Sequence, residues 1–123
     1  MDGVTDRISL TIPADERFRS VPTLVLGGIG SRLDLPYERM DDLQLAVLSL
    51  LEAVAGDEAT LDVVADDGFL AVTVGPLRPG SGDDAALGRV VSRLVDAVEP
   101  GTRDGADWIT VRVARLVEPD GAS

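Results

Sequence analysis

The chain has 123 residues, a length typical of one domain, and 45% of them are hydrophobic, which suffices for a sizeable core. Its 11 basic and 22 acidic residues give a net charge of -11, a balance that disfavours nucleic acids and anionic membrane surfaces as partners. The absence of cysteine and histidine excludes disulfides and thiol chemistry, together with the commonest general base and metal ligand.

The N-terminal residues carry no signal for export. Residues 1–6 lack the basic and apolar regions of a signal peptide, and no apolar run in the chain reaches the roughly 18 residues that span a bilayer. We therefore expect a cytoplasmic protein with a single domain over residues 1–123. The tail after residue 117 is expected to be disordered.

Sequence patterns predict one strand and two helices in the first half of the chain. Polar and apolar residues alternate over residues 7–13, as in a strand with one buried face. A helix is predicted over residues 20–32, with Ser20 as its N-cap. A second helix is predicted over residues 37–55, because Leu and Val recur there at helical spacing.

A hairpin is the strongest local signal in the chain. Two strands are predicted over residues 60–65 and 69–74, and Asp66-Asp67-Gly68 between them is typical of a tight turn. The segment that follows, residues 75–82, is rich in Gly and Pro and is predicted to be a loop.

The last part of the chain is predicted to hold a helix and a strand. The apolar stripe predicts a helix over residues 83–98, and the alternation over residues 108–116 predicts a strand. Pro100-Gly101 and Asp104-Gly105 are expected to form turns between them. The order is therefore strand, helix, helix, strand, strand, helix, strand. It predicts an α+β two-layer sandwich, in which three helices cover one face of a mostly antiparallel sheet.

The predicted helices carry more apolar residues than one sheet face needs. We expect some of this surplus to form a protein interface. The residues concerned are Leu24, Val25, Leu26, Leu48 and Leu51.

Four segments, residues 8–14, 20–22, 41–47 and 87–99, point to a family. In this order they resemble segments of the anti-sigma-factor serine kinases, above all small actinobacterial ones, in the histidine-kinase-type (GHKL) ATPase superfamily. The most specific is DDLQLAV at residues 41–47, which is similar to the family's "DDLxLAV" lead-in to the nucleotide-site helix. The resemblance implies the histidine-kinase-type ATPase fold, a nucleotide site and a homodimer. It also implies a sigma factor or a STAS-type anti-sigma antagonist as the protein partner.

The groups that make these relatives kinases are missing. In the family, "LAV" is followed by a Glu that activates the attacking hydroxyl and, four residues later, by an Asn that holds Mg²⁺. The resemblance puts Ser49 and Ala53 at these two positions, and neither side chain has the required chemistry. Glu52 is close in sequence, but it points about a quarter turn away on a helix.

A second departure concerns the loop predicted after the hairpin. The family has Asp-x-Gly-x-Gly there, and its Asp binds the adenine amino group, whereas this chain has Gly75 and no carboxylate. Gly80 and Gly82 remain as candidates for an anion-binding loop, and Gly88 matches the "LG" of the family's last helix. By composition alone the same segment is a surface loop, next to acidic residues that repel phosphate.

Three functions remain open after these departures. The first is a degenerate regulator, a pseudokinase that acts by protein–protein binding in sigma-factor partner switching, with weak or absent ATP binding. The second is an active ATP- and Mg²⁺-dependent serine kinase that phosphorylates a STAS-type antagonist, with Glu52 and a carboxylate such as Asp83 in place of the missing groups. The third is a structural dimer partner for an active paralogue. No catalytic residue, metal ligand or firmly bound cofactor is assigned; the degenerate nucleotide site consists of Ser49, Glu52, Ala53, Gly75, Gly80, Gly82 and Gly88.

Overall fold

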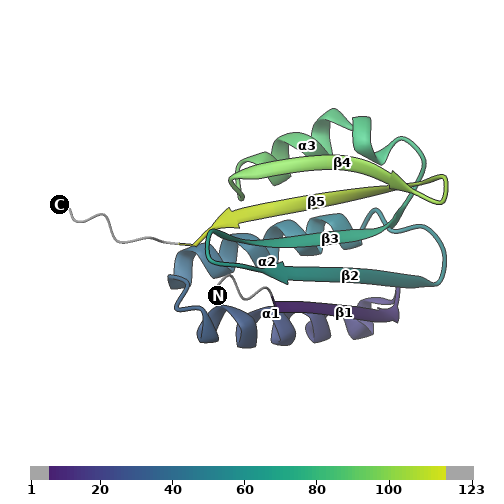
Figure 1. The fold of residues 1–123 in the computed structure, drawn as a ribbon. Helices are drawn as coiled ribbons and strands as arrows, with labels where there is room; N and C mark the ends of the chain where they lie inside the picture. The colour runs from purple at the N-terminus through teal and green to yellow at the C-terminus, as the bar shows by residue number, and fades with distance from the viewer. Residues whose placement is uncertain (1–5, 116–123) are drawn as a thin grey trace.

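Two layers make up the fold: a five-stranded sheet and three α-helices on one of its faces (Figure 1). The structure is a computed structural model and describes residues 6–115. Neighbouring strands are antiparallel throughout, in the order β1-β2-β3-β5-β4. The strands are β1 (Asp6–Pro13), β2 (Glu58–Ala65), β3 (Phe69–Leu77), β4 (Ala97–Arg103) and β5 (Ala106–Ala114). The predicted α+β two-layer architecture is confirmed, whereas the tail predicted after residue 117 lies outside the described residues.

The helices match the prediction most closely at the start of the chain. They are α1 (Ser20–Arg32), α2 (Tyr37–Leu51) and α3 (Ala85–Ser92), with the short 3-10 helices η1 (Glu16–Phe18) before α1 and η2 (Ser81–Asp83) before α3. The bounds predicted for the first helix are confirmed. Within residues 6–115, no helix combines the length and the apolar composition needed to cross a bilayer.

The N-cap predicted for the first helix is wrong. Ser20 is the first helical residue, and Arg19 before it already has helical backbone angles, with φ −70° and ψ −19°. The cap lies one turn earlier, where the carboxylate of Asp15 accepts a hydrogen bond from the N–H of Arg17 at 2.9 Å. The reason is that η1 leads directly into α1, so the chain enters the helix before it reaches Ser20.

The second helix is shorter than predicted. It ends at Leu51 rather than at residue 55, because residues 53–55 run antiparallel to the end of β3, with a bridge between Val54 and Leu77. β3 itself continues to Leu77, so the loop predicted from residue 75 onwards is wrong for residues 75–77.

The third helix is shorter than predicted at both ends, and an unpredicted fifth strand follows it after turns and bends at residues 93–96. α3 ends at Ser92, and Ala97–Arg103 forms β4, which pairs with β5. By sequence alone, Ala97 and Val98 at the end of the predicted helix fit a helix or a strand, and their pairing with Arg112 and Val111 of β5 selects the strand. The turn predicted at Pro100-Gly101 is therefore wrong, because both residues lie inside β4. This strand is at the edge of the sheet, where the missing N–H of a proline is tolerated.

Both of the other predicted turns are confirmed. β2 and β3 pair across Asp66-Asp67-Gly68, and the carboxylate of Asp66 accepts hydrogen bonds from the N–H of Gly68 (2.8 Å) and of Phe69 (2.9 Å). Between β4 and β5, Asp104 and Gly105 have φ 52° and φ 81°, the left-handed angles that a type I′ turn requires. Local hydrogen bonds and backbone angles therefore account for both turns.

The core lies between the sheet and α2. In this helix Leu43, Val47 and Leu50 are at most 1% exposed. The strands contribute every second residue, as the alternation predicts. The buried residues of the three inner strands include Leu61, Val63, Leu70, Val72, Val74, Ile109, Val111 and Val113.

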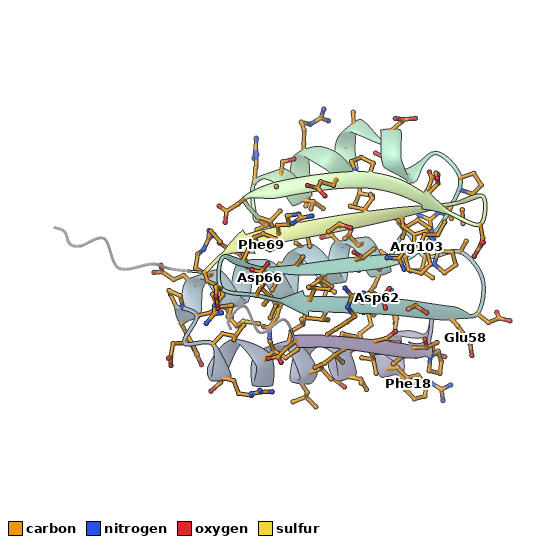
Figure 2. The ribbon with its side chains drawn as sticks, in the orientation of Figure 1. Phe18, Glu58, Asp62, Asp66, Phe69 and Arg103 are labelled. Carbon is orange, nitrogen blue, oxygen red and sulfur yellow. The ribbon has the colours of Figure 1, made fainter. Side chains whose placement is uncertain are left out.

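The opposite face of the sheet is polar. Cross-strand hydrogen bonds join the Ser9 hydroxyl to the carboxylate of Asp62 (2.7 Å) and Thr73 to Thr110 (2.6 Å). The guanidinium of Arg103 also donates to Asp62, at 2.6 Å, and both side chains are labelled in Figure 2. Polar side chains thus satisfy one another on this face, which no helix of the described chain covers.

Candidate functional site

The three predicted site residues near the end of α2 are engaged in local contacts. The hydroxyl of Ser49 donates to the carbonyl of Leu45 at 3.0 Å, so it is turned back onto its own helix. Glu52 is exposed, and its carboxylate lies 3.4 Å from the guanidinium of Arg19. Ala53 is 6% exposed and brings no polar side chain. None of these three presents a free carboxylate or amide to a ligand.

Backbone pairing joins the end of α2 to the end of β3. The N–H of Ala55 donates to the carbonyl of Pro76 (2.9 Å), and the N–H of Arg78 donates to the carbonyl of Ala53 (2.8 Å). The guanidinium of Arg78 donates to the carbonyl of Glu52 at 2.9 Å. The two segments in which the resemblance implies a metal-binding Asn and an adenine-binding Asp therefore bind each other instead.

Gly75 lies apart from the other predicted site residues. It is in β3 and not in a loop, and it faces the polar side of the sheet, where a Cβ would meet the ring of Trp108. Gly82 and Gly88 line a cleft on the helix side. The structure therefore does not bring Gly75 into one site with these two glycines.

The predicted anion-binding loop already holds a carboxylate of the chain. Asp107 at the start of β5 accepts hydrogen bonds from the N–H of Gly80 (3.0 Å) and of Gly82 (3.2 Å) through the same oxygen. Gly80 has φ 89°, the left-handed angle that lets both N–H groups converge. Sequence reasoning missed Asp107, because nothing in its local pattern sets it apart from the chain's other carboxylates.

A cleft of ≈ 210 Å³ lies between α2, η2, α3, β4 and β5. Of the predicted site residues it contains Gly82 and Gly88, next to Leu50 of α2. Its apolar wall consists of Leu50, Leu87, Val91, Val98, Pro100 and Ile109.

The polar groups of this cleft are few. Ser81, Ser92 and Asp84 line it, and the carboxylate of Asp84 is occupied, because it caps α3 by accepting a hydrogen bond from the N–H of Leu87 at 3.0 Å. No basic side chain lines the cleft, and among residues 6–115 no three carboxylates gather into a set of metal ligands. The arrangement is suited to binding apolar groups and offers little to bind phosphate or to move a proton.

A second concave surface lies between α1 and α2; we call it the α1–α2 groove. It has a volume of ≈ 520 Å³ and is lined by Ser31 of α1, by Asp34 of the connection and by Tyr37 and Asp41 of α2, among others. Tyr37 is 87% exposed. Within the described chain, Asp34 and Asp41 make no side-chain hydrogen bond or ion pair.

The nearest cations are held away from the α1–α2 groove. Arg32 at the end of α1 lies 3.8 Å from the carboxylate of Asp6 in β1. Arg39 in α2 forms an ion pair with Asp96, on the side of β4. The groove is therefore locally negative.

Two exposed leucines extend the groove along its helices. Leu24 is 74% exposed and lies on the same face of α1 as Ser31, seven residues on. Leu45 is 53% exposed and lies four residues after Asp41 on α2. The amide of Gln44 donates to the carbonyl of Thr23 at 3.0 Å and ties the two helices together at this level.

Of the five apolar helix residues expected to exceed the needs of the core, one is exposed. Leu26 and Leu51 are buried, and Val25 and Leu48 pack against the core. Only Leu24 is left exposed. The second exposed leucine, Leu45, was not predicted, because its helical stripe is mixed with charged residues.

Comparison with known proteins gives no family. No family model matches the chain, and no curated protein matches it either. The resemblance to the anti-sigma-factor serine kinases thus rests on the chain's own sequence segments.

Proposed function

We propose that this protein is a non-catalytic regulator that acts by protein–protein contact in the cytoplasm. By resemblance it is a degenerate relative of the anti-sigma-factor kinases with the histidine-kinase-type ATPase fold, and its partner is a sigma factor or a STAS-type antagonist. The observation that carries the proposal is the α1–α2 groove, where two carboxylates without a side-chain partner among residues 6–115 lie beside exposed apolar side chains.

The chemistry of the groove favours a basic, amphipathic segment as the bound part of the partner. Asp34 and Asp41 supply negative charge, and Leu24, Tyr37 and Leu45 supply apolar surface on either side. A helix with apolar residues on one face and Arg or Lys beside them fits such a groove. Sigma factors meet this requirement in principle, because proteins that bind DNA neutralise its phosphates with basic side chains.

The groups near the cleft support contact rather than catalysis. Ser49 is bonded to its own helix, Ala53 has no metal-binding atom, and the N–H groups of Gly80 and Gly82 are taken by Asp107. A kinase would need a carboxylate base and a phosphate-binding loop at these positions. Glu52, the substitute weighed for the base, is paired with Arg19 at the surface.

The proposal includes a homodimer through β1. This strand is at the edge of the sheet and pairs only with β2. Its one proline, Pro13, is at its end, whereas the other edge strand carries Pro100 in its middle. An unprotected edge strand is a template for pairing with a second chain. Sedimentation velocity should therefore detect a dimer, and Ile8→Lys, which adds a charge to the edge, should shift it toward monomer.

Binding to purified candidate sigma factors and antagonists tests the contact surface. Asp34→Asn combined with Asp41→Asn should weaken binding by about tenfold or more, and added salt should weaken binding by the wild type more than by this variant. Asp57→Asn combined with Asp67→Asn makes the same change of charge at two exposed sites outside the groove and should bind nearly as the wild type does. Equal losses in both double variants would contradict the groove as the contact surface.

Calorimetric titration with ATP and with ADP, each with Mg²⁺, tests the absence of kinase function. We expect no heat up to millimolar nucleotide, meaning binding weaker than about −4 kcal/mol. Micromolar binding would contradict the proposal and favour the ATP-dependent kinase. The candidate antagonists would then be assayed for phosphorylation.

A further inference from the structure

Ser81 is the one buried polar residue of the described chain. It is 8% exposed, and it lines the cleft between α2 and α3. Its backbone is fully used, because its N–H donates to the carbonyl of Arg78 (3.0 Å) and its carbonyl accepts from the N–H of Asp84 (3.2 Å). Its hydroxyl has no hydrogen-bond partner among residues 6–115. The oxygen is not among the fully buried unpaired side-chain atoms, so a hydrogen-bonding group from outside the chain can reach it.

The wall around this hydroxyl is apolar and well buried. Leu50 is 0% exposed, Val91 is 1% exposed and Ile109 is 4% exposed, and these three come from α2, α3 and β5. The carboxylate of Asp84 already caps α3. The cleft therefore offers apolar contact on several sides, with the mostly buried Ser81 hydroxyl inside it and the exposed Ser92 at its edge.

The size of the cleft restricts what it can hold. Its volume is ≈ 210 Å³, below the roughly 300–1,000 Å³ of pockets for drug-sized ligands. It exceeds the roughly 150 Å³ of an apolar cavity that binds benzene. A molecule with one ring or a short branched chain fits, and a nucleoside triphosphate, with its size and charge, does not.

We propose that the cleft binds a small, neutral, mostly apolar molecule whose one polar group hydrogen-bonds to the Ser81 hydroxyl. Phenols and alcohols with a single ring have this chemistry. The ligand contacts α3 through Leu87 and Val91 and the sheet through Ile109, so it strengthens the attachment of α3 to the rest of the fold. The inference does not depend on the partner proposed above, because it concerns a different surface.

Phenol and toluene are the probes, and the full chain is titrated with each while amide shifts are followed by NMR. Phenol should give saturable shifts concentrated at the residues of the cleft, with a Kd on the order of 1 mM. It should also raise the unfolding temperature, as any ligand that binds only the folded state does. Ser81→Ala should weaken phenol by roughly two- to tenfold, the value of one hydrogen bond, and leave toluene unchanged.

Filling the cleft supplies a second, independent variant. Gly88 of α3 lines the cleft, and a Cβ there meets nothing within 4 Å, so Gly88→Leu adds a bulky side chain at the cleft without a backbone clash. It should abolish phenol binding, because the side chain occupies the space. Gly28→Leu is the matched control: Gly28 is a helical glycine of α1 that also has nothing within 4 Å of its Cβ position, and it does not line the cleft.

Three outcomes would overturn the proposal. One is phenol shifts that do not saturate or that are scattered over the surface. Another is equal binding of phenol by wild type and Gly88→Leu. The third is displacement of phenol by ATP, which would make the cleft a nucleotide site. None of these depends on whether a sigma factor binds the α1–α2 groove.

Discussion

The indole ring of Trp108 lies against the backbone of Gly75 on the polar face of the sheet. A Cβ at position 75 would lie 2.6 Å from Cε3 and 2.7 Å from Cε2 of this ring, well inside van der Waals contact. The guanidinium of Arg103 also lies over the ring, 4.5 Å from its centroid. The tryptophan therefore takes the place of a side chain at residue 75, which explains why the strand carries a glycine there.

Gly75→Ala should destabilise the protein by about 1–3 kcal/mol, because the added methyl overpacks a filled site. Urea unfolding followed by circular dichroism measures the change. Gly101→Ala, in β4, is the control, because a Cβ there meets nothing within 4 Å. The cost of Gly75→Ala should also shrink when it is measured in a Trp108→Ala background. If the two glycine variants behave alike, the indole is not the cause.

Asp84→Ala should reduce the free energy of unfolding by about 1 kcal/mol, within the 0.5–2 kcal/mol typical of a lost N-cap. Its carboxylate accepts the N–H of Leu87 at 3.0 Å, which leaves that donor unsatisfied after the substitution. Asp83→Ala removes the neighbouring carboxylate, which makes no side-chain bond among residues 6–115, and it should have a smaller effect. Equal effects in urea unfolding would indicate loss of charge rather than loss of a cap.

Asp107→Ala should cost about 1.5–3 kcal/mol, since two N–H groups lose a charged acceptor. The freed donors of Gly80 and Gly82 should then take an external anion. Sulfate stabilises folded proteins in general because it is excluded from their surfaces. The gain in unfolding free energy should nevertheless be larger for Asp107→Ala than for the wild type. Asp67→Ala, at an exposed carboxylate without a side-chain bond in the described chain, is the control. Identical sulfate effects in all three proteins would contradict an anion site at this loop.

Asp62 should make the protein less stable in acid. Its partial burial, the largest single influence, raises its pKa. The hydrogen bonds from Arg103 and Ser9 and the charges of Arg103 and Arg7 together outweigh burial, and the pKa lies below its usual value of 3.8. A lowered pKa in the folded state gives stability that is complete above the unfolded pKa and is lost as the pH falls through the folded pKa.

The test is the difference in unfolding free energy between wild type and Asp62→Asn, followed from about pH 6 downward. It should be constant at first, should begin to shrink below about pH 3.8, where the carboxylate becomes protonated in the unfolded chain, and should be lost as the pH falls through the lower pKa of the folded state. A difference that stays constant to about pH 2 would show that the ion pair with Arg103 contributes nothing.

The elements that sequence predicts best are those with a strictly local cause. The first helix has its predicted bounds, and the turn at Asp66-Asp67-Gly68 forms through hydrogen bonds that span two and three residues. The third helix fails because its apolar residues suit two conformations. The pairing of Ala97–Arg103 with β5 across the turn at Asp104-Gly105 decides between them, and Ala97 itself lies opposite Arg112, 15 residues further along the chain.

The candidate site is less predictable for the same reason. Gly82 and Gly88 do share a cleft, but Gly75 faces the other side of the sheet, and the side chain of Ser49 turns back to Leu45. Strand alternation would have placed Gly75 on the polar face if β3 had been predicted to continue past residue 74. The Gly75-Pro76 pair instead predicted a loop. The α1–α2 groove has no signal in the sequence, because it depends on how far apart two helices pack.

The sequence by itself determined the two layers, because the periods of its apolar residues specify which face of each helix and strand is buried. It also determined the turns at Asp66-Asp67-Gly68 and Asp104-Gly105, through residues that tolerate left-handed angles or bond their own backbone. Only the tertiary structure decided that Asp107 binds the loop of Gly80, that Trp108 covers Gly75, and that Ser81 lines a cleft between α2 and α3. Each of these relationships joins residues distant in the chain, so it depends on the packing of whole elements, which no local pattern encodes.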